Sequence, residues 1–306
     1  MRERAPGTAS GNAAVRAGAA HVAANVDPAT VEHFGREWSH FDQTEASVTE
    51  LAATFEQYFS VFPWASLSGD AVGFDFGCGS GRWAAFVAPR VGQLHCVDAS
   101  DSALAVARRN LARLSNCRFH LATPDTLPFP DSSMDFGYSL GVLHHLPDPE
   151  EGLRACIRRL KPGAPFLLYM YYRFDDRPAW FRALWRVSDV ARRLISRLPH
   201  RARLAVSGGI AAVAYWPLAR VAAVLDRQGV DVSALPLSFY RNRSFYTMRN
   251  DALDRFGTRL EHRYTAEEIG FMMTAAGLTD IEFSRGEPYW CAMGRRRSDS
   301  LATPAP

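Results

Sequence analysis

The feature that most constrains the fold is the segment 72–83, Val-Gly-Phe-Asp-Phe-Gly-Cys-Gly-Ser-Gly-Arg-Trp, in which an apolar run ends in three alternating glycines. An apolar, helix-compatible stretch follows at once. This order predicts a strand, a tight turn and a helix start, where an α/β fold brings its backbone against a nucleotide-like ligand. Glycine suits such a turn because it adopts backbone angles that other residues avoid and leaves no Cβ beside the ligand.

The spacing of the glycines separates the ligand classes. A dinucleotide site requires G-x-G-x-x-G, and Arg82 breaks that pattern. A P-loop requires Gly-Lys followed by Ser or Thr, and the only lysine of the chain is Lys161. The pattern present, D-x-G-x-G-x-G from Asp75 to Gly81, resembles the first motif of class I S-adenosylmethionine (SAM) methyltransferases.

Four further apolar segments predict strands, 93–98, 119–122, 134–139 and 165–172, and they alternate with helical segments. Such alternation predicts a mostly parallel, doubly wound sheet. The segment 93–98 ends in Asp98, about 20 residues after the glycines, where a carboxylate can bind both hydroxyls of a ribose. The two segments 278–283 and 288–294 predict a terminal hairpin that completes the sheet.

The order of Leu-Pro-Phe (127–129), Gly-Val-Leu-His-His-Leu (141–146) and Leu-Lys-Pro-Gly (160–163) is similar to that of small-molecule methyltransferases of the ubiquinone-biosynthesis type. The resemblance implies a Rossmann-like, seven-stranded sheet with an antiparallel C-terminal strand, SAM as the cofactor and a small-molecule acceptor. It also implies a set of cofactor-binding residues: Asp75, Gly77, Gly79, Gly81, Asp98, Ser139 and, for the adenine, Thr123 or Asp125.

The N-terminal segment 31–41 predicts a helix with Phe34 and Trp38 on one face. In similar methyltransferases such a helix folds over the cofactor, and these rings would then meet the sulfonium by cation–π contact. The alternative is an amphipathic helix that only packs on the sheet.

Proton removal from an acceptor hydroxyl is assigned to the pair His144 and His145, which follows the fourth strand. One histidine is expected to act as the base and the other to be structural, with turnover falling between about pH 6 and 7. The alternative is that the pair only shapes the pocket. Similar methyltransferases carry an acid at the end of the fifth strand, but here that region (169–172) holds none. Tyr171 and Tyr172 are expected to bind substrate there, so a partner for the base must come from elsewhere.

The long segment 173–262 is too long for a loop and predicts a largely helical insertion that forms the acceptor lid. Tyr240, Arg243 and Tyr246 are its expected substrate-binding residues. A helix near Trp180 and Trp185 has an apolar stripe and several arginines; core packing or an oligomer contact, such as a homodimer, is favoured for it over a membrane surface. The apolar run 210–225 is too short to span a bilayer.

Composition narrows the setting. A net charge of +3 does not indicate nucleic-acid binding, and five cysteines without a C-x-x-C pair indicate free thiols of a cytoplasmic protein and no metal site. Along the chain we expect a flexible tail (1–27), a helical cap (28–70), the SAM-binding core (71–172), the insertion (173–262), the end of the core (263–296) and a second flexible tail (297–306).

The sequence thus predicts a SAM-dependent methyltransferase of biosynthesis that methylates a hydroxyl of a secondary-metabolite or sugar-like acceptor. N- or C-methylation of a lipid-like substrate is the alternative reaction. A SAM-binding interaction module without catalysis is the alternative of a different class.

Overall fold

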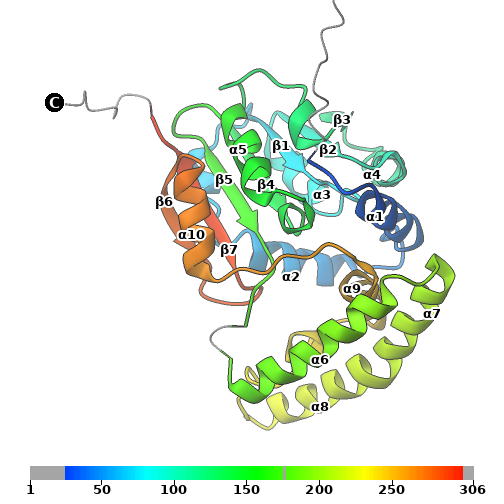
Figure 1. Cartoon of the computed structure of the whole chain (residues 1–306). Helices are drawn as coiled ribbons and strands as arrows, with labels where there is room; N and C mark the ends of the chain where they lie inside the picture. Colours follow the sequence, from blue (N-terminus) through cyan, green and yellow to red (C-terminus); the bar gives the residue numbers. More distant parts are fainter. Residues whose placement is uncertain (1–24, 175–176, 299–306) are drawn as a thin grey trace, which may run out of the picture.

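A seven-stranded sheet runs through the molecule in the order β3-β2-β1-β4-β5-β7-β6 (Figure 1). The computed structural model describes residues 25–174 and 177–298. Strand β7 is antiparallel to both of its neighbours, and the other pairs are parallel, which confirms the predicted Rossmann-like fold class. The strands are β1 (Val72–Phe76), β2 (Gln93–Asp98), β3 (Cys117–Leu121), β4 (Phe136–Leu140), β5 (Pro165–Tyr169), β6 (Leu278–Phe283) and β7 (Cys291–Arg296).

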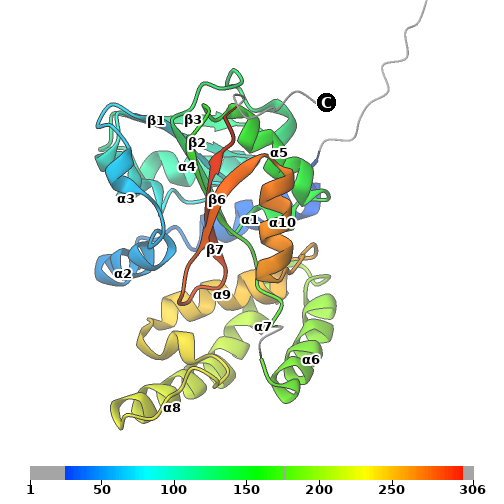
Figure 2. The ribbon, with the colours of Figure 1, turned by 90° about the vertical axis from the view of Figure 1, so that its left-hand side faces the viewer.

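Helices cover both faces of the sheet (Figure 2). One apolar core joins the sheet to α5 and α10, and a second core joins it to α2, α3 and α4. The helices of the described residues are α1 (Pro28–His40), α2 (Val48–Tyr58), α3 (Ala84–Val87), α4 (Asp101–Asn110), α5 (Pro149–Arg159), α6 (Ala179–Ile195), α7 (His200–Ile210), α8 (Trp216–Arg227), α9 (Phe245–Gly257) and α10 (Ala266–Ala275).

Local signals fix several helix starts. The Asp148 side chain accepts the Glu151 N–H at 2.9 Å and so caps α5, as its sequence predicts. Thr265 and Glu268 form the predicted capping box of α10. Because these caps satisfy N–H groups that a helix leaves without partners, they place each helix start at a defined residue.

The insertion forms a separate helical layer, α6 to α9, at the carboxyl ends of the parallel strands (Figures 1 and 2). We call this layer the lid. Helices α7 and α8 join through a π-helical turn, η5 (Ala211–Tyr215), into one helix, His200–Arg227, of 28 residues. Among the described residues this is the one helix long and apolar enough to cross a membrane by length and composition, and 28% of its apolar window is buried. The helix is therefore longer than the run 210–225 suggests.

The predicted tail boundaries move slightly. Most of the first tail lies outside the described residues, but Asn25 belongs to the fold: it donates its backbone N–H to Asp125 at 2.7 Å and its side-chain amide to the Asp148 carbonyl at 2.7 Å. At the other end, the Arg297 N–H donates to the Gly277 carbonyl at 2.9 Å. Both ends are thus tied to the core closer to the termini than predicted.

Candidate functional site

The glycine turn after β1 is held by Asp98 at the end of β2. The Asp98 carboxylate accepts the Gly79 N–H at 2.9 Å and the Ser100 N–H at 2.8 Å. Burial raises the pKa of Asp98, and these two N–H donors act against that rise. Each carboxylate oxygen keeps a further lone pair, so Asp98 can still accept hydrogen bonds from a ribose.

All three glycines of the turn have positive φ, with values of 80°, 54° and 77° for Gly77, Gly79 and Gly81. A Cβ on Gly79 would lie 2.7 Å from the Trp38 indole, and one on Gly77 would lie 2.3 Å from Val142. Both neighbours line the cavity described below. Glycine is therefore required by the backbone conformation and by the cavity wall packed on the turn.

Helix α1 covers the turn. Phe34 and Trp38 both line the cavity, and the Phe34 ring lies 4.9 Å from the His145 ring. The Arg82 guanidinium lies 5.0 Å from the Trp38 ring centroid. From the lid, the Asn250 amide of α9 donates to Glu37 of the same helix at 2.6 Å. The helix is thus part of the site wall and also contacts the lid.

Six predicted cofactor residues do not line the cavity: Gly79 and Gly81 of the turn, and four residues with other partners. Ser139 donates its hydroxyl to the Phe76 carbonyl at 3.0 Å, and Asp75 is buried beneath the turn, where burial raises its pKa to about 8. Thr123 caps a short 3-10 turn, and Asp125 accepts the Asn25 N–H. In this region Pro124 forms the cavity wall. These residues build the site and do not line it.

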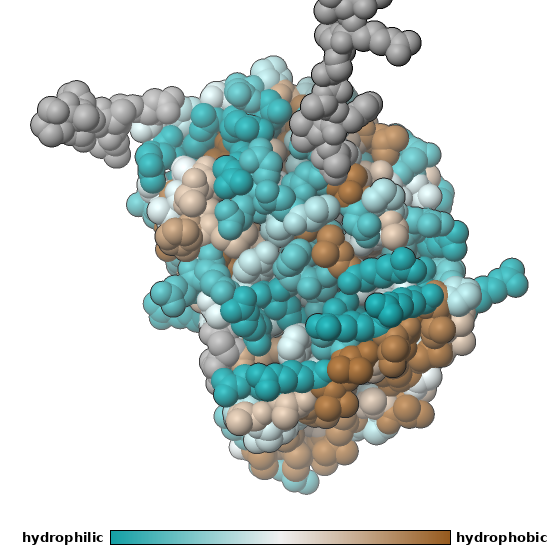
Figure 3. All heavy atoms as spheres, in the orientation of Figure 1, coloured by the Kyte–Doolittle hydropathy of each residue, from teal (hydrophilic) through white to brown (hydrophobic). Residues whose placement is uncertain are grey.

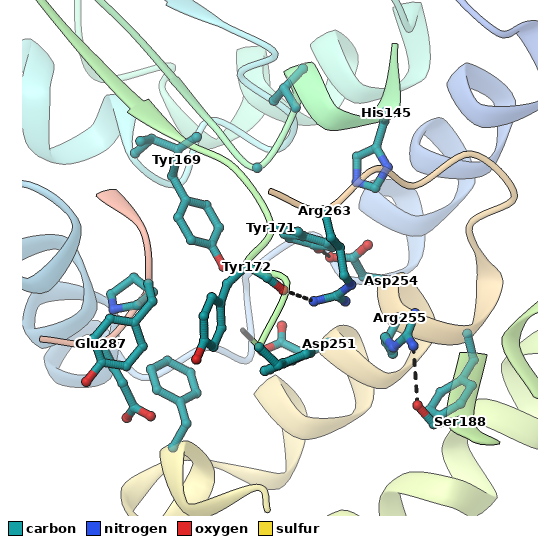
Figure 4. A pocket seen from close by; sticks show the side chains of 18 of the residues that line it. His145, Tyr169, Tyr171, Tyr172, Ser188, Asp251, Asp254, Arg255, Arg263 and Glu287 are labelled. Carbon is teal, nitrogen blue, oxygen red and sulfur yellow. Dashed lines mark hydrogen bonds between the residues drawn. The ribbon is translucent and has the colours of Figure 1, made fainter. Parts of the chain in front are cut away.

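A single cavity of about 600 Å³ joins the glycine turn to the lid. Its far end is surrounded by tyrosines and acids (Figure 4). The tyrosines of this wall are Tyr58, Tyr169, Tyr171, Tyr172, Tyr215 and Tyr240, and the acids are Asp251, Asp254 and Glu287. Walls of this kind, apolar with a few polar groups, are typical of sites for small molecules.

The two histidines have different surroundings. His145 lines the cavity, and its Nδ1 lies 2.7 Å from the Leu260 carbonyl, which can only accept. In the neutral ring the proton is therefore on Nδ1 and the lone pair on Nε2, which has no hydrogen-bond partner among the described residues. Burial lowers the pKa of His145, which keeps the ring neutral.

His144 is a packing residue in this structure. It is fully buried, it does not line the cavity, and its ring stacks on Tyr171 with centroids 3.9 Å apart. Tyr171 in turn donates its hydroxyl to Asp254 and lines the cavity beside His145 (Figure 4). His144 therefore supports a wall residue from behind.

Two acids of α9 face the cavity three residues apart. Burial raises the pKa of Asp251 to about 6, with Arg82 acting against the rise. Burial also raises the pKa of Asp254, and His145 acts against that rise. Asp254 of α9 is thus an acid near the histidine, and it comes from the lid.

Two arginines of the cavity wall, Arg255 and Arg263, pair with the same buried acid, Glu261. Glu261 bonds Arg255 at 3.0 Å and Arg263 at 2.7 Å, and its side chain is only 2% exposed. Burial by itself would raise the pKa of Glu261, but Arg263 and Arg255 hold it below the usual value. This pairing fixes both guanidinium groups against the wall, where Arg263 lies 5.0 Å from the Tyr171 ring centroid.

Two of the predicted lid residues have another role. Arg243 is 9% exposed, and it donates to the Glu50 carbonyl, Thr54 and Gln57 of α2. The Tyr246 hydroxyl accepts the Gln43 N–H at 2.9 Å. Both residues fasten the lid to the N-terminal helices and do not line the cavity, whereas Tyr240 does.

We expect Arg243→Ala to lower the melting temperature by several degrees, because it removes three hydrogen bonds made by a side chain that is only 9% exposed, at a cost of roughly 1–3 kcal/mol. The matched control is Arg285→Ala, since Arg285 is exposed. Differential scanning calorimetry measures both. An unchanged melting temperature in the Arg243 variant would show that the clamp contributes nothing to stability.

Sequence reasoning missed several wall residues. Arg82 entered the analysis only as the residue that breaks a dinucleotide pattern, yet it lies in the cavity next to the glycines. Asp251 and Asp254 carried a usable signal, because two acids at i and i+3 of one helix share one face. Glu287 and Tyr289 carried none, since they follow β6 in a loop.

Comparison with known proteins places the core. Residues 74–168 match the family model described as "Methyltransferase domain". Over 104 residues the chain is 34% identical to the uncharacterized methyltransferase YcgJ of Bacillus subtilis (strain 168), which covers 33% of this chain and 41% of that protein. It is 28% identical over 159 residues to the ubiquinone biosynthesis O-methyltransferase of Azoarcus sp. (strain BH72), covering 45% of this chain and 60% of that protein.

The solved structure of the Bacillus subtilis YcgJ protein aligns with a TM-score of 0.43 and 18% identity, over 82% of this chain and 100% of that one. The sequence matches span less than two thirds of these relatives. The chain carries the core domain of a class I SAM-dependent methyltransferase. SAM is the cofactor of that domain.

The site residues fit SAM. Asp98 can accept from the ribose, Arg82 can pair with the methionine carboxylate, and Phe34 and Trp38 are rings that a sulfonium favours. Within residues 25–174 and 177–298, no group of three or more metal-binding side chains gathers.

Proposed function

We propose that this protein methylates a hydroxyl group of a small, partly aromatic or amphiphilic molecule bound among the tyrosines of the lid cavity. The observation that carries the proposal is His145 Nε2, a buried acceptor on the cavity wall without a partner among the described residues. A neutral imidazole at that place accepts the hydroxyl proton as the oxygen attacks. The sugar-like or secondary-metabolite acceptor of the sequence analysis falls within this class.

The residues of the chain divide the work. When bound, SAM supplies an electrophilic methyl group. At one end of the cavity, Asp98, Arg82 and the glycine turn would hold SAM. At the other end, the tyrosine walls align the acceptor. His145 takes the proton on Nε2, while Leu260 holds Nδ1–H and Asp254 stabilises the imidazolium that forms. Helix α1 and the lid exclude water from the reacting atoms.

A second candidate is methylation of an amine. Asp251 and Asp254, both half-buried and both on the cavity wall, would attract a cationic amine group, and the surrounding aromatic rings would bind its methylated forms. A protonated amine must first lose a proton to become a nucleophile. Once it is neutral, it attacks the methyl group through its lone pair and needs no base during the transfer itself. The two candidates therefore differ in their dependence on His145.

The test is a product screen with SAM carrying a labelled methyl group and panels of phenols, alcohols and amines, read by mass. With a hydroxyl acceptor, kcat/KM should stay level at pH 7 and fall only below about 6.5, because neutral His145 is the active form and burial lowers its pKa from 6.5. The acid limb thus lies lower than the sequence alone predicts. Labelled amines with no labelled alcohol or phenol would favour the second candidate, and no transfer to any acceptor would favour the interaction module.

A further inference from the structure

The lid has an unusual outer surface. All but three of the exposed large apolar side chains of the described residues lie between residues 180 and 245. On the face that Figure 3 shows, apolar side chains gather over the lid helices and are bordered by long hydrophilic side chains. An apolar area of this extent on a protein surface indicates a binding face. The α6 stripe, for which the sequence analysis favoured core packing or an oligomer contact, is thus exposed at most of its positions, whereas Phe181 and Trp185 line the cavity.

The stripe on α6 follows helical spacing. Trp180, Leu184, Val187, Leu194 and Leu198 recur at intervals of three, four and seven residues and so share one face. Their side chains are between 38% and 68% exposed. A parallel set on the long helix includes Val213, which is 78% exposed, and Val221 and Val224, which are 54% and 51% exposed. We call these residues together the apolar face.

A basic stripe runs beside the apolar face. Arg182, Arg186 and Arg193 stand at i, i+4 and i+11 of α6, so they share a second face about 120° from the first, and Arg197 follows just past the end of the helix. All four are exposed. A second cavity of about 490 Å³ lies on this side of the helix, and six arginines line it, three of them from this stripe.

We propose that the lid docks on an anionic phospholipid bilayer, with the apolar face in the outer part of the hydrocarbon and the basic stripe at the level of the phosphates. An amphipathic helix with this order of apolar and basic faces lies in a membrane interface. The phosphate groups of anionic phospholipids carry the charge that complements this exposed basic stripe. A second copy of this chain would instead bring the same arginine stripe to the contact.

The contacts of the helix His200–Arg227 favour a position on the bilayer surface and argue against a membrane-spanning one. Its inner face is packed into the lid core through Ala211, Tyr215 and Ala219. Midway along it, Arg220 donates to the carbonyls of Tyr240 at 3.3 Å and Arg243 at 3.1 Å. A crossing would place this cation in hydrocarbon and remove those partners, which is costly.

The cavity opens toward the same face. Leu184 of α6 and Leu218 of α8 both line the large cavity, and they are 52% and 45% exposed. The apolar wall of the cavity therefore continues onto the docking face. This continuity, which rests on the proposed methyl transfer, points to an acceptor with an apolar tail that enters between α6 and α8.

The docking is tested without any acceptor, by co-sedimentation of the full chain with vesicles of phosphatidylcholine alone and of phosphatidylcholine mixed with phosphatidylglycerol. We expect the mixed vesicles to bind the protein and added salt to weaken the binding. The double variant Val187→Ser/Leu194→Ser should weaken it at least about 10-fold. Arg186→Gln/Arg197→Gln should weaken binding to the mixed vesicles by a similar factor.

Matched controls keep the test sharp. Phe271→Ser removes an apolar side chain on α10 that is 76% exposed, and Arg285→Gln removes an exposed arginine after β6; both should bind vesicles like the parent protein. Equal binding by all variants, or no binding to the mixed vesicles, would overturn the proposal. So would a stable dimer that Val187→Ser/Leu194→Ser converts to monomer, since a second copy would then cover the face. Failure here leaves the product screen unaffected.

Discussion

His145→Asn is expected to lower kcat with a hydroxyl acceptor by about 10²–10⁴-fold while the affinity for SAM changes little. The asparagine amide can still donate to the Leu260 carbonyl, as Nδ1 does at 2.7 Å, but nothing replaces Nε2. The variant thus removes the acceptor atom and keeps the local hydrogen bond. Single-turnover rates and calorimetric SAM titrations measure the two effects separately.

The matched control for this variant is His120→Asn, because His120 lies on β3 away from the cavity wall. It should keep the parent rate. A near-normal rate in the His145 variant, with SAM affinity and melting temperature intact, would remove the general base from the mechanism. Alignment by the tyrosine walls would then account for the transfer, as expected for an amine acceptor.

Asp98→Ala is expected to weaken SAM binding by about 10- to 100-fold, since charged hydrogen bonds contribute roughly 1.5–3 kcal/mol. The structure adds a second reason: this carboxylate also fixes the Gly79 and Ser100 N–H groups of the turn. The SAM affinity of Asp98→Asn should lie between those of the parent protein and of Asp98→Ala, because the one carbonyl oxygen of asparagine can accept from one of these N–H donors. Isothermal titration calorimetry gives the dissociation constants.

Asp101→Ala serves as the control for the ribose assignment. Asp101 begins α4 three residues further on, and its side chain is 78% exposed. Its loss should leave SAM affinity unchanged. If Asp98→Ala also binds SAM like the parent protein, then Asp98 only holds the turn and the ribose has another partner.

The core was predictable because its signals are local. A strand that ends in alternating glycines and a second strand that ends in an acid define their own geometry, and the parallel sheet then brings Gly79 and Asp98 together. The caps of α5 and α10 are local in the same sense. Ser139 and Asp75 do not line the cavity, and the sequence could not indicate this, because position on a strand does not tell which face a short side chain serves.

The lid was less predictable because its contacts are long-range. Arg243 bonds to Gln57 of α2, which lies 186 residues earlier in the chain, and no local sequence pattern indicates a contact between such distant residues. Helical spacing identified the apolar stripe of α6 but not what lies against it, since a buried and an exposed stripe have the same period. Asp254 shows the same limit: its importance comes from its place near His145, which only the fold reveals.

Helix α1 joins the two halves of the site, because Phe34 contacts His145 and Glu37 is bonded to Asn250 of α9. A ligand that settles this helix at one end of the cavity also prepares the other end. By thermodynamic linkage, if bound acceptor raises the affinity for the cofactor by some factor, bound cofactor must raise the affinity for the acceptor by the same factor. The order of entry then affects only the rates, and the demethylated cofactor leaves slowly for as long as the methylated product keeps α1 in place.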